Sequence, residues 1–288
     1  MSANQYMKQA PRQTQSTQPG IEREMTPLPT QPFDYKGAEQ LKGKVAIITG
    51  GDSGIGRAVA MAFACEGAHI VLNYLEEEQR EAEEVATFVR EQGVDALLVP
   101  GDLTDPNVAS LIVTKAIESF GEINIVVNNA AVQYPVKHFL DITPEQWHKT
   151  FATNIDAIFY LTKAALPHLK RGDNIICTTS VNAYKGHSIL IDYTATKGAI
   201  VGFVRSLAQN LADQQIRVNM VAPGPIWTPL IPATFNEEQV KSFGQDAALG
   251  RPGQPEELVG AYVLLASNRG SYMTGQCIHV NGGTVMHS

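Results

Sequence analysis

The sequence predicts an α/β fold: a single-domain, doubly wound parallel sheet of the Rossmann type, with about seven strands and helices on both faces. Three observations support this prediction. Short apolar runs recur along the chain, longer segments with helical periodicity separate them, and a glycine-rich stretch follows the first run. The 288 residues, 44% of them hydrophobic, can build one large core. Since no repeat and no second core are evident, we expect one domain.

Seven apolar runs rich in β-branched residues are the expected strands. They lack polar alternation, which is typical of strands buried on both faces of a parallel sheet. The runs are residues 45–49, 69–74, 96–100, 123–128, 174–180, 216–223 and 277–280.

The longer segments between these runs are the expected helices. Residues 76–93 begin with acidic residues, which complement a helix macrodipole, and continue with apolar residues at helical spacing. Those apolar residues are Ala82, Val85, Phe88 and Val89. Further helices are expected at residues 57–66, 144–170 and 192–212, so that strand and helix alternate through right-handed crossovers.

Residues 1–40 form an N-terminal extension of different composition. They are rich in Gln, Pro, Thr and Ser and contain few apolar residues before Phe33 and Tyr35. Such a segment buries too little apolar surface to fold alone. We expect it to be partly disordered or packed on the body, residues 41–288, with a partner-binding role as the alternative.

The charge and the ligand-type residues exclude several classes of function. The formal net charge is -7, so the chain offers no basic face to a phosphate backbone and we expect no nucleic-acid partner. Cys65, Cys177 and Cys277 have neither disulfide-framework nor zinc-ligand spacing and are interpreted as free thiols in a reducing compartment. The seven histidines, His287 among them, show no metal-ligand pattern, so no metal is expected.

The sequence contains no membrane-targeting signal. No apolar run approaches the roughly 20 residues that a membrane-spanning helix needs. Residues 1–13 lack the apolar segment of a secretory signal. We therefore expect a cytoplasmic protein without a membrane partner.

The glycine-rich stretch TGGDSGIG, residues 49–56, joins the first strand to the first helix. Glycine is favoured where the backbone must turn tightly or approach a ligand closely, and a helix N-terminus offers unpaired N–H groups to an anion. The pyrophosphate of a dinucleotide fits there, whereas a simple tight turn is the alternative for this motif alone. The expected cofactor-binding residues in this loop are Gly50, Asp52, Ser53, Gly54, Ile55 and Gly56.

Polar residues follow other strands of the predicted sheet. The carboxyl ends of parallel strands meet at one edge, which is where ligands bind in open α/β sheets. Asp102 is placed to bond an adenine amino group. The expected cofactor-binding residues at these strand ends are Asn73, Tyr74, Asp102, Leu103, Asn129 and Ala130.

The order of motifs resembles that of the classical short-chain dehydrogenase/reductase family, from about Leu41 to Gly283. These motifs are TGGDSGIG (49–56), NNAA (128–131), Ser180, YTATK (193–197) and PGPIWTP (223–229). The resemblance implies an NAD(P)-dependent oxidoreductase that transfers a hydride between a nicotinamide cofactor and a small or medium alcohol, aldehyde, ketone or sugar-like substrate. Ala131 and Ala157 stand where the family commonly has glycine, which are changes of one methyl group.

Tyr193 and Lys197 are one helical turn apart, so both project from the same face of a helix. A neighbouring cation favours the phenolate, so we expect Lys197 to lower the pKa of Tyr193 toward the working range of a general acid/base. By itself such a pair is commonly a surface pair. The resemblance implies a catalytic set that Ser180 and Asn154 complete, with Ser180 stabilising the substrate oxygen and Asn154 holding a water. Lys197 would also hold the nicotinamide ribose, so Tyr193 and Lys197 count among the cofactor-binding residues.

The resemblance also implies a segment that fixes the nicotinamide carboxamide, formed by Pro223, Gly224, Ile226 and Thr228. The choice between NAD and NADP is read at the end of the second strand. There the chain has neither the acidic residue that selects NAD nor a basic residue for a 2′-phosphate, but Glu76, Glu77 and Glu78 follow and would oppose that phosphate. The cofactor is NAD or NADP, and the sequence favours NAD.

Residues 228–250 are where the family places a mobile lid over the substrate. This segment has no cluster of cations for a phosphate or CoA ester. Polar residues of adjoining loops are expected to reach the pocket and permit a polar, polyhydroxy substrate: Gln133, Tyr134, Lys185 and His187.

Two other functions are compatible with a dinucleotide-binding fold. One is a sensor or scaffold that binds the dinucleotide without turnover, which would not need all four catalytic residues. The other is an epimerase or dehydratase of the extended branch, which usually has a different glycine spacing and a larger C-terminal region.

Surplus apolar residues on two helices predict a homotetramer. The helices 144–170 and 192–212 carry apolar residues on more than one face, although a helix on a sheet needs one stripe. These residues are Ile155, Phe159, Leu166, Ile200, Val201, Phe203, Val204 and Leu207. The resemblance implies D₂ symmetry, with a second contact at the last helix and strand. Leu258, Tyr262 and Leu265 would supply it, or would only cover the sheet edge.

Overall fold

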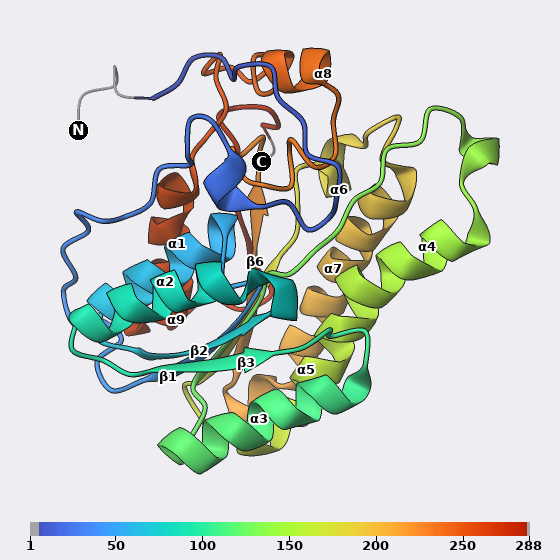
Figure 1. Cartoon of the computed structure of the whole chain (residues 1–288). Coiled ribbons are helices and arrows are strands. Elements are labelled where there is room, and N and C mark those ends of the chain that lie inside the picture. The colour runs from blue at the N-terminus through green and yellow to red at the C-terminus, as the bar shows by residue number, and fades with distance from the viewer. Residues whose placement is uncertain (1–5, 287–288) are drawn as a thin grey trace.

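The computed structural model describes residues 6–286 and contains a single sheet of seven parallel strands (Figure 1). The strand order is β3-β2-β1-β4-β5-β6-β7, so the order reverses between β1 and β4. The predicted doubly wound fold is therefore confirmed. The strands are β1 (Val45–Thr49), β2 (His69–Tyr74), β3 (Ala96–Pro100), β4 (Ile125–Asn128), β5 (Asn174–Thr178), β6 (Arg217–Pro223) and β7 (Cys277–Val280).

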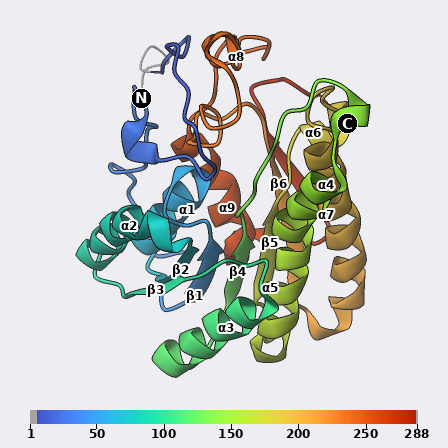
Figure 2. The same cartoon turned by 45° about the vertical axis from the view of Figure 1, so that its right-hand side comes forward.

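Helices cover both faces of this sheet. One face packs against α1, α2 and α9, and the other against α3, α5 and α7. α4 and α5 follow one another in line along one flank, and α7 runs beside them (Figure 2). The α-helices are α1 (Gly54–Cys65), α2 (Gln79–Glu91), α3 (Pro106–Phe120), α4 (Pro144–Phe151), α5 (Ala157–Ala165), α6 (Asn182–Lys185), α7 (Ile191–Asn210), α8 (Glu237–Ser242) and α9 (Val259–Ala266).

The core has two layers because successive side chains of a strand point to opposite faces. Ala46 and Ile48 belong to one apolar cluster, whereas Val45 and Ile47 belong to the other. The prediction that every strand is buried on both faces is wrong for β3 and β7, which are mostly half-buried. These two strands lie at the edges of the sheet, where each has a single neighbour.

Several element boundaries differ from those predicted. α1 begins at Gly54 instead of residue 57, because Gly54 tolerates the left-handed conformation (φ +51°) that starts the helix. The expected helix 144–170 is interrupted by a π-helical segment at residues 152–156 and ends in a 3₁₀ turn at 166–168. β4 begins at residue 125 and β5 ends at 178, so both are shorter than expected.

The described part of the extension, residues 6–40, has one short regular element, a 3₁₀ turn at Glu22–Glu24. It runs beside the segment that contains α8 and past the start of α1 (Figures 1 and 2). Residues 1–5, 287 and 288, including His287, lie outside the described residues. Among residues 6–286, no helix has the length and apolar character needed to cross a membrane.

Candidate active site

The carboxyl ends of the strands open into one pocket of about 900 Å³. Gly56 and Asn154 lie outside its lining, whereas the other predicted site residues contribute to it. Those lining residues are Gly50, Asp52, Ser53, Gly54, Ile55, Asn73, Tyr74, Asp102, Leu103, Asn129, Ala130, Ser180, Tyr193, Lys197, Pro223, Gly224, Ile226 and Thr228.

The glycine loop has the geometry of a phosphate cradle. Gly50 has a φ of +58°, a left-handed conformation that glycine adopts without strain. A Cβ atom on Gly56 would overlap the carbonyl oxygen of Gly50, so only glycine lets the turn close at this point. The loop therefore brings the N-terminus of α1 to the pocket, where the N–H groups that follow Gly54 suit the pyrophosphate of a dinucleotide, while the N–H of Gly54 itself is bound by Glu22.

Asn129 supports the loop. Its Nδ2 donates to the carbonyl oxygens of Thr49 (3.1 Å) and Gly50 (3.3 Å), and its Oδ1 accepts a hydrogen bond from the Thr178 hydroxyl. The backbone N–H groups of Asn129 and Ala130 both donate to Thr49 Oγ1. Asn129 thus joins the ends of β1, β4 and β5 and fixes the floor of the pocket.

Asn73, Tyr74 and Asp102 line the end of the pocket that lies at β2 and β3. Asn73 donates to the carbonyl oxygens of Val99 and Gly101, so its amide ties β2 to β3. The Tyr74 hydroxyl donates to Gln79 Oε1 at 2.6 Å. Asp102 lines the pocket while one of its oxygens accepts the N–H of Thr104 at 2.9 Å.

Two carboxyl groups, Asp52 and Glu78, meet at this end of the pocket. Burial raises the pKa of Asp52, and burial and the charge of Asp52 together raise the pKa of Glu78. Asp52 forms side-chain hydrogen bonds with Ser53 and Glu78, and its Oδ2 is buried. A negatively charged carboxyl pair suits a ribose hydroxyl, which can donate a hydrogen bond, and disfavours a phosphate, which is an anion. The pocket therefore fits a dinucleotide.

Tyr193 and Lys197 point from α7 into the other end of the pocket, and both are buried. Lys197 Nζ lies 5.4 Å from the centre of the Tyr193 ring and donates to the carbonyl oxygen of Thr178 at 2.9 Å. The expected lowering of the Tyr193 pKa is wrong for this structure, since burial raises that pKa to about 12. The ammonium hydrogen-bonds Thr178 while it lies over the Tyr193 ring, and burial lowers the pKa of Lys197 itself to about 8.

Ser180 follows β5 and faces Tyr193. A hydrogen bond with Ser180 opposes the effect of burial on the pKa of Tyr193. Ser180 Oγ also accepts the backbone N–H of Asn182 at 3.1 Å, which starts α6. The two hydroxyl groups therefore converge on one point of the pocket, where a substrate oxygen can receive hydrogen bonds from both.

Asn154 lies in the π-helical segment and is fully buried. Its amide exchanges two hydrogen bonds of 2.9 Å with the backbone of Val132 and donates a third to Thr196 Oγ1. Its side chain therefore orients the chain after β4 against α7. A water held by this residue would have to bond its main-chain carbonyl.

The segment after β6 closes the pocket against the glycine loop. A Cβ atom on Gly224 would lie 2.6 Å from the Cα of Asn281, so this position requires glycine. A Cβ atom on Gly54 would lie 3.1 Å from the side chain of Thr228, which places the two segments in close contact.

The four residues expected near the substrate, Gln133, Tyr134, Lys185 and His187, all line the pocket. Burial and the nearby charge of Lys185 lower the pKa of His187. Among residues 6–286, no group of three or more His, Cys, Asp or Glu side chains is arranged to hold a metal ion.

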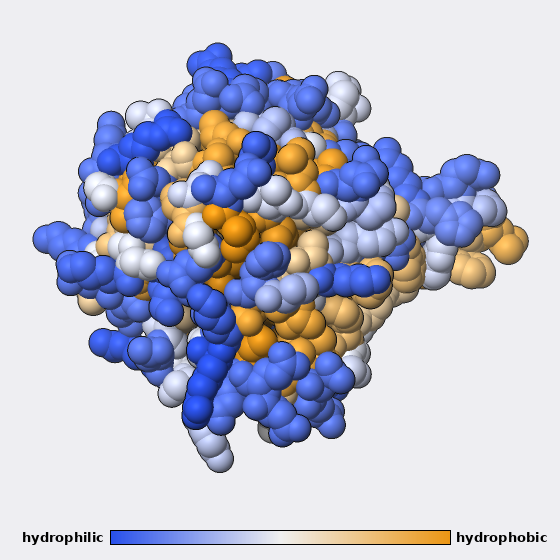
Figure 3. All heavy atoms as spheres, turned by 90° about the horizontal axis from the view of Figure 1, so that it is seen from below, coloured by the Kyte–Doolittle hydropathy of each residue, from blue (hydrophilic) through white to orange (hydrophobic). Residues whose placement is uncertain are grey.

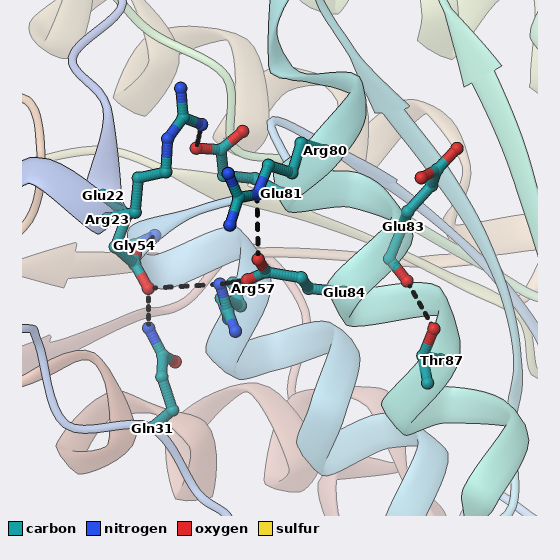
Figure 4. A network of polar contacts seen from close by, with 10 residues as sticks. All are labelled: Glu22, Arg23, Gln31, Gly54, Arg57, Arg80, Glu81, Glu83, Glu84 and Thr87. Carbon is teal, nitrogen blue, oxygen red and sulfur yellow. Dashed lines mark hydrogen bonds and ion pairs between the residues drawn. The ribbon is translucent and has the colours of Figure 1, made fainter.

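Sequence reasoning missed the contribution of the extension to the site. Gln18, Pro19 and Gly20 line the pocket, and Glu22 Oε2 accepts the N–H of Gly54 at 2.6 Å. Figure 4 shows Glu22 between Gly54, Arg57 and Gln31. No signal in the Gln- and Pro-rich composition distinguishes these residues from their neighbours.

A doubly wound sheet with a glycine-lined anion cradle and a buried Tyr–Lys–Ser set at the same edge defines a nicotinamide-dependent oxidoreductase. A family model described as "Enoyl-(Acyl carrier protein) reductase" matches residues 50–285. The chain belongs to the short-chain dehydrogenase/reductase family. It is accordingly an NAD(P)-dependent oxidoreductase that acts on alcohol or carbonyl groups.

Curated relatives match nearly the whole chain. "General stress protein 39" of Bacillus subtilis is 58% identical, over 96% of this chain and 97% of its own length. "NADPH-dependent aldehyde reductase 1, chloroplastic" of Arabidopsis thaliana is 48% identical, over 96% and 99%. "Glucose and ribitol dehydrogenase" of Daucus carota is 46% identical, over 97% and 98%.

Solved structures share the fold. A short-chain dehydrogenase from Burkholderia cenocepacia in complex with NADP superposes with a TM-score of 0.80 at 27% identity, covering 85% of this chain and 99% of that chain. A 3-ketoacyl-(acyl-carrier-protein) reductase from Brucella melitensis complexed with NADH gives 0.78 at 30% identity, covering 85% and 100%. Both cofactors thus occur among similar structures.

Proposed function

We propose that Tyr193 is the general acid/base of this oxidoreductase, with Ser180 and Lys197 beside it, and that the substrate is a small polyhydroxy aldehyde, ketone or alcohol. The observation that supports this most strongly is the convergence of the Tyr193 and Ser180 hydroxyls at the substrate end of the pocket. A bound nicotinamide supplies or accepts the hydride.

Each residue then has a defined part in carbonyl reduction. The Tyr193 hydroxyl donates its proton to the substrate oxygen, and Ser180 donates a hydrogen bond to the same oxygen. The Lys197 ammonium stabilises the resulting phenolate and bonds the ribose next to the nicotinamide. Asn154 keeps the loop after β4 in place, and the water of the proton relay lies at its backbone carbonyl. Alcohol oxidation reverses these proton transfers.

The polar lining supports a polyhydroxy substrate. Gln133, Tyr134, Lys185 and His187 surround the substrate end with hydrogen-bonding groups. Lys185 also forms a 3.7 Å ion pair with Asp246 of the segment 228–250, which we propose to be the lid. The names of two relatives, glucose and ribitol dehydrogenase and aldehyde reductase, are consistent with such substrates.

We propose further that the enzyme prefers NAD to NADP, although one relative is named NADPH-dependent. The support is the pair Asp52 and Glu78, which would repel a 2′-phosphate and offers an acceptor to a ribose hydroxyl. The test compares the dissociation constants of NADH and NADPH.

The variant Glu78→Gln tests the role of the acidic pair directly. At pH 9, where a carboxyl group with a pKa of about 8 is ionised, this variant removes a charge. It keeps an oxygen that can accept the N–H of Leu75, so the turn before α2 is retained. At that pH we expect NADPH affinity to rise about tenfold, as one charge interaction of about 1.4 kcal/mol implies, with NADH affinity little changed. The exposed Glu76→Gln is the matched control. If wild-type protein binds NADPH more tightly than NADH, the proposed preference is wrong.

We propose a homotetramer in a reducing compartment such as the cytoplasm. Phe159 is 47% exposed and lies beside the half-buried Phe203 and the half-buried Ile155 of the π-helical segment. This segment, α5 and α7 therefore present a mostly apolar hollow, which Asp156 also lines, to a partner. Apolar side chains also gather in the centre of the face shown in Figure 3. The three cysteines are free thiols, which suits a reducing compartment.

A further inference from the structure

The extension and the lid share a small apolar core of their own. Ala10 and Met25 of the extension are buried against Trp227, Ile231 and Val240. Two backbone oxygens connect the same segments: Trp227 Nε1 donates to the carbonyl of Pro27 at 2.9 Å, and the N–H of Gln15 donates to the carbonyl of Pro232 at 2.7 Å. Residues 10–27 of the extension are thus packed on Trp227 and the lid that follows it.

Glu22 fastens the same segment to the cofactor loop. Its carboxylate is 4% exposed and is bound by the N–H of Gly54, by Gln31 Nε2 (3.1 Å) and by the guanidinium of Arg57 (3.5 Å), as Figure 4 shows. A buried carboxylate is stable only when it is paired in this way. Residues 15–22 therefore cross the site between two fixed points, the lid and the N-terminus of α1.

Gln18 lies between these fixed points and reaches the substrate end. Its Oε1 accepts the N–H of Gln133 at 3.2 Å, and its Nε2 donates to the carbonyl of the same residue. Its Nε2 also approaches Thr234 Oγ1 of the lid at 3.4 Å, and Gln133 Nε2 donates to that oxygen at 3.1 Å. One side chain of the extension therefore joins the chain after β4 to the lid.

We propose that Gln18 is a positioning residue for the substrate: it latches the lid to the chain after β4 and so sets the substrate affinity of the oxidoreductase site. Gln133 lines the pocket, and Thr234 directly precedes Phe235, which also lines it. Gln133 directly follows Val132, whose backbone Asn154 holds against α7. Pro19 and Gly20 complete this wall. Gly20 fits because any Cβ atom would overlap the carbonyl of Pro229. The inference rests on the proposed function.

The test compares Gln18→Met with Gln13→Met. Methionine has nearly the size of glutamine but cannot form the amide hydrogen bonds, so the wall is kept and the latch is removed. Gln13 is the matched control, because its amide makes the same two-way bond with the backbone of Thr26 in an exposed part of the extension. The probes are NADH and glyceraldehyde, a small hydroxyaldehyde.

We expect Gln18→Met to raise KM for glyceraldehyde about tenfold, because that is the effect of losing about two net hydrogen bonds. The dissociation constant of NADH should stay within about twofold. Gln13→Met should change neither. An unchanged KM in Gln18→Met, or an equal loss of NADH affinity, would overturn the proposal.

Hydrogen exchange tests the latch independently of the oxidoreductase function, since the measurement needs no turnover. Gln18→Met should accelerate exchange in peptides from residues 229–243 and 131–136, and Gln13→Met should not. Unchanged exchange in both regions contradicts the latch. Faster exchange in a protein whose wild type reduces no hydroxyaldehyde would support the latch and contradict the proposed substrate class.

Discussion

At the scale of single residues, the site combines groups whose ordinary charge is disfavoured by burial. The pKa of Lys197 is lowered to about 8, while the pKa values of Tyr193, Asp52 and Glu78 are raised. Such shifts cluster at functional sites. The shifts of Lys197, Asp52 and Glu78 are also a cost to folding, because burial disfavours the charged form that each has in the unfolded chain, whereas Tyr193 is neutral at pH 7 in both states.

Lys197→Met tests the double role of the ammonium. We expect turnover to fall by about 100-fold or more and NADH to bind more weakly, since one group stabilises the phenolate and bonds the ribose. Turnover with varied NADH and fluorescence titration of NADH measure the two effects. Unchanged NADH affinity would contradict the proposed contact between Lys197 and the ribose.

The same variant has a predicted pH signature. In the folded wild type Lys197 has a pKa of about 8, against 10.5 when unperturbed, so the unfolded chain binds more protons between these values. The destabilisation caused by burying this ammonium is therefore complete below pH 8 and is relieved as the pH rises toward 10.5, so the stability of the fold rises with pH across that window. Urea unfolding at pH 7 and pH 9.5 should show this gain in the wild type and not in Lys197→Met. An equal pH response in both proteins contradicts the assigned pKa.

At the scale of elements, the glycine loop shows which features a sequence can predict. Gly50 and Gly56 were predicted from the spacing because close backbone approach has few solutions other than glycine. The start of α1 was placed three residues late, because Gly54 begins the helix from a left-handed conformation that composition does not reveal. The π-helical segment around Asn154 was missed for a similar reason: it depends on the contact with Val132, which is distant in sequence.

Gly56→Ala should abolish cofactor binding or folding, since the new methyl group would overlap the carbonyl of Gly50. Gly198→Ala is the control, because this α7 glycine has open space around its Cβ position. There alanine should stabilise the helix by about 0.5–1 kcal/mol. Thermal unfolding with and without NADH measures both variants. A Gly56→Ala protein that binds NADH normally would show that the loop is not the cradle.

The polar contacts of the extension could not be predicted at all. Gln18 and Glu22 stand in a Gln- and Pro-rich segment, and apart from Gln31 their partners lie more than 30 residues away. Composition indicates that such a segment cannot fold alone, but it does not reveal which side chains fasten it to the body.

At the scale of the whole molecule, the strand order, the layers and the site edge follow from the alternation of strand and helix. The structure does not support the second tetramer contact that the sequence predicts. Leu258, Tyr262 and Leu265 are fully buried within one chain, so they cover the sheet, which is the alternative stated for them, and do not supply a contact. Helical spacing alone does not distinguish a residue that packs on its own sheet from one that packs on a partner.

Phe159→Glu tests the proposed assembly. A charge in the apolar hollow of α5 and α7 should break the contact at that twofold axis, so a protein of four times the 31.2 kDa chain mass should become a dimer. Light scattering at micromolar concentration measures the mass. Exposed Thr87→Glu on α2, which packs on the other face of the sheet, is the control for the added charge. A wild-type mass of one chain would contradict the tetramer directly.

The most direct test of the central claim is Tyr193→Phe, which removes the hydroxyl and keeps the ring against Lys197. The account predicts that reduction of glyceraldehyde falls by at least about 1,000-fold, with NADH affinity within a few fold, because only the proton-transferring group is lost. Nicotinamide absorbance and NADH titration measure the two quantities on one preparation. Substantial turnover by Tyr193→Phe would contradict the claim that this buried phenol is the general acid/base.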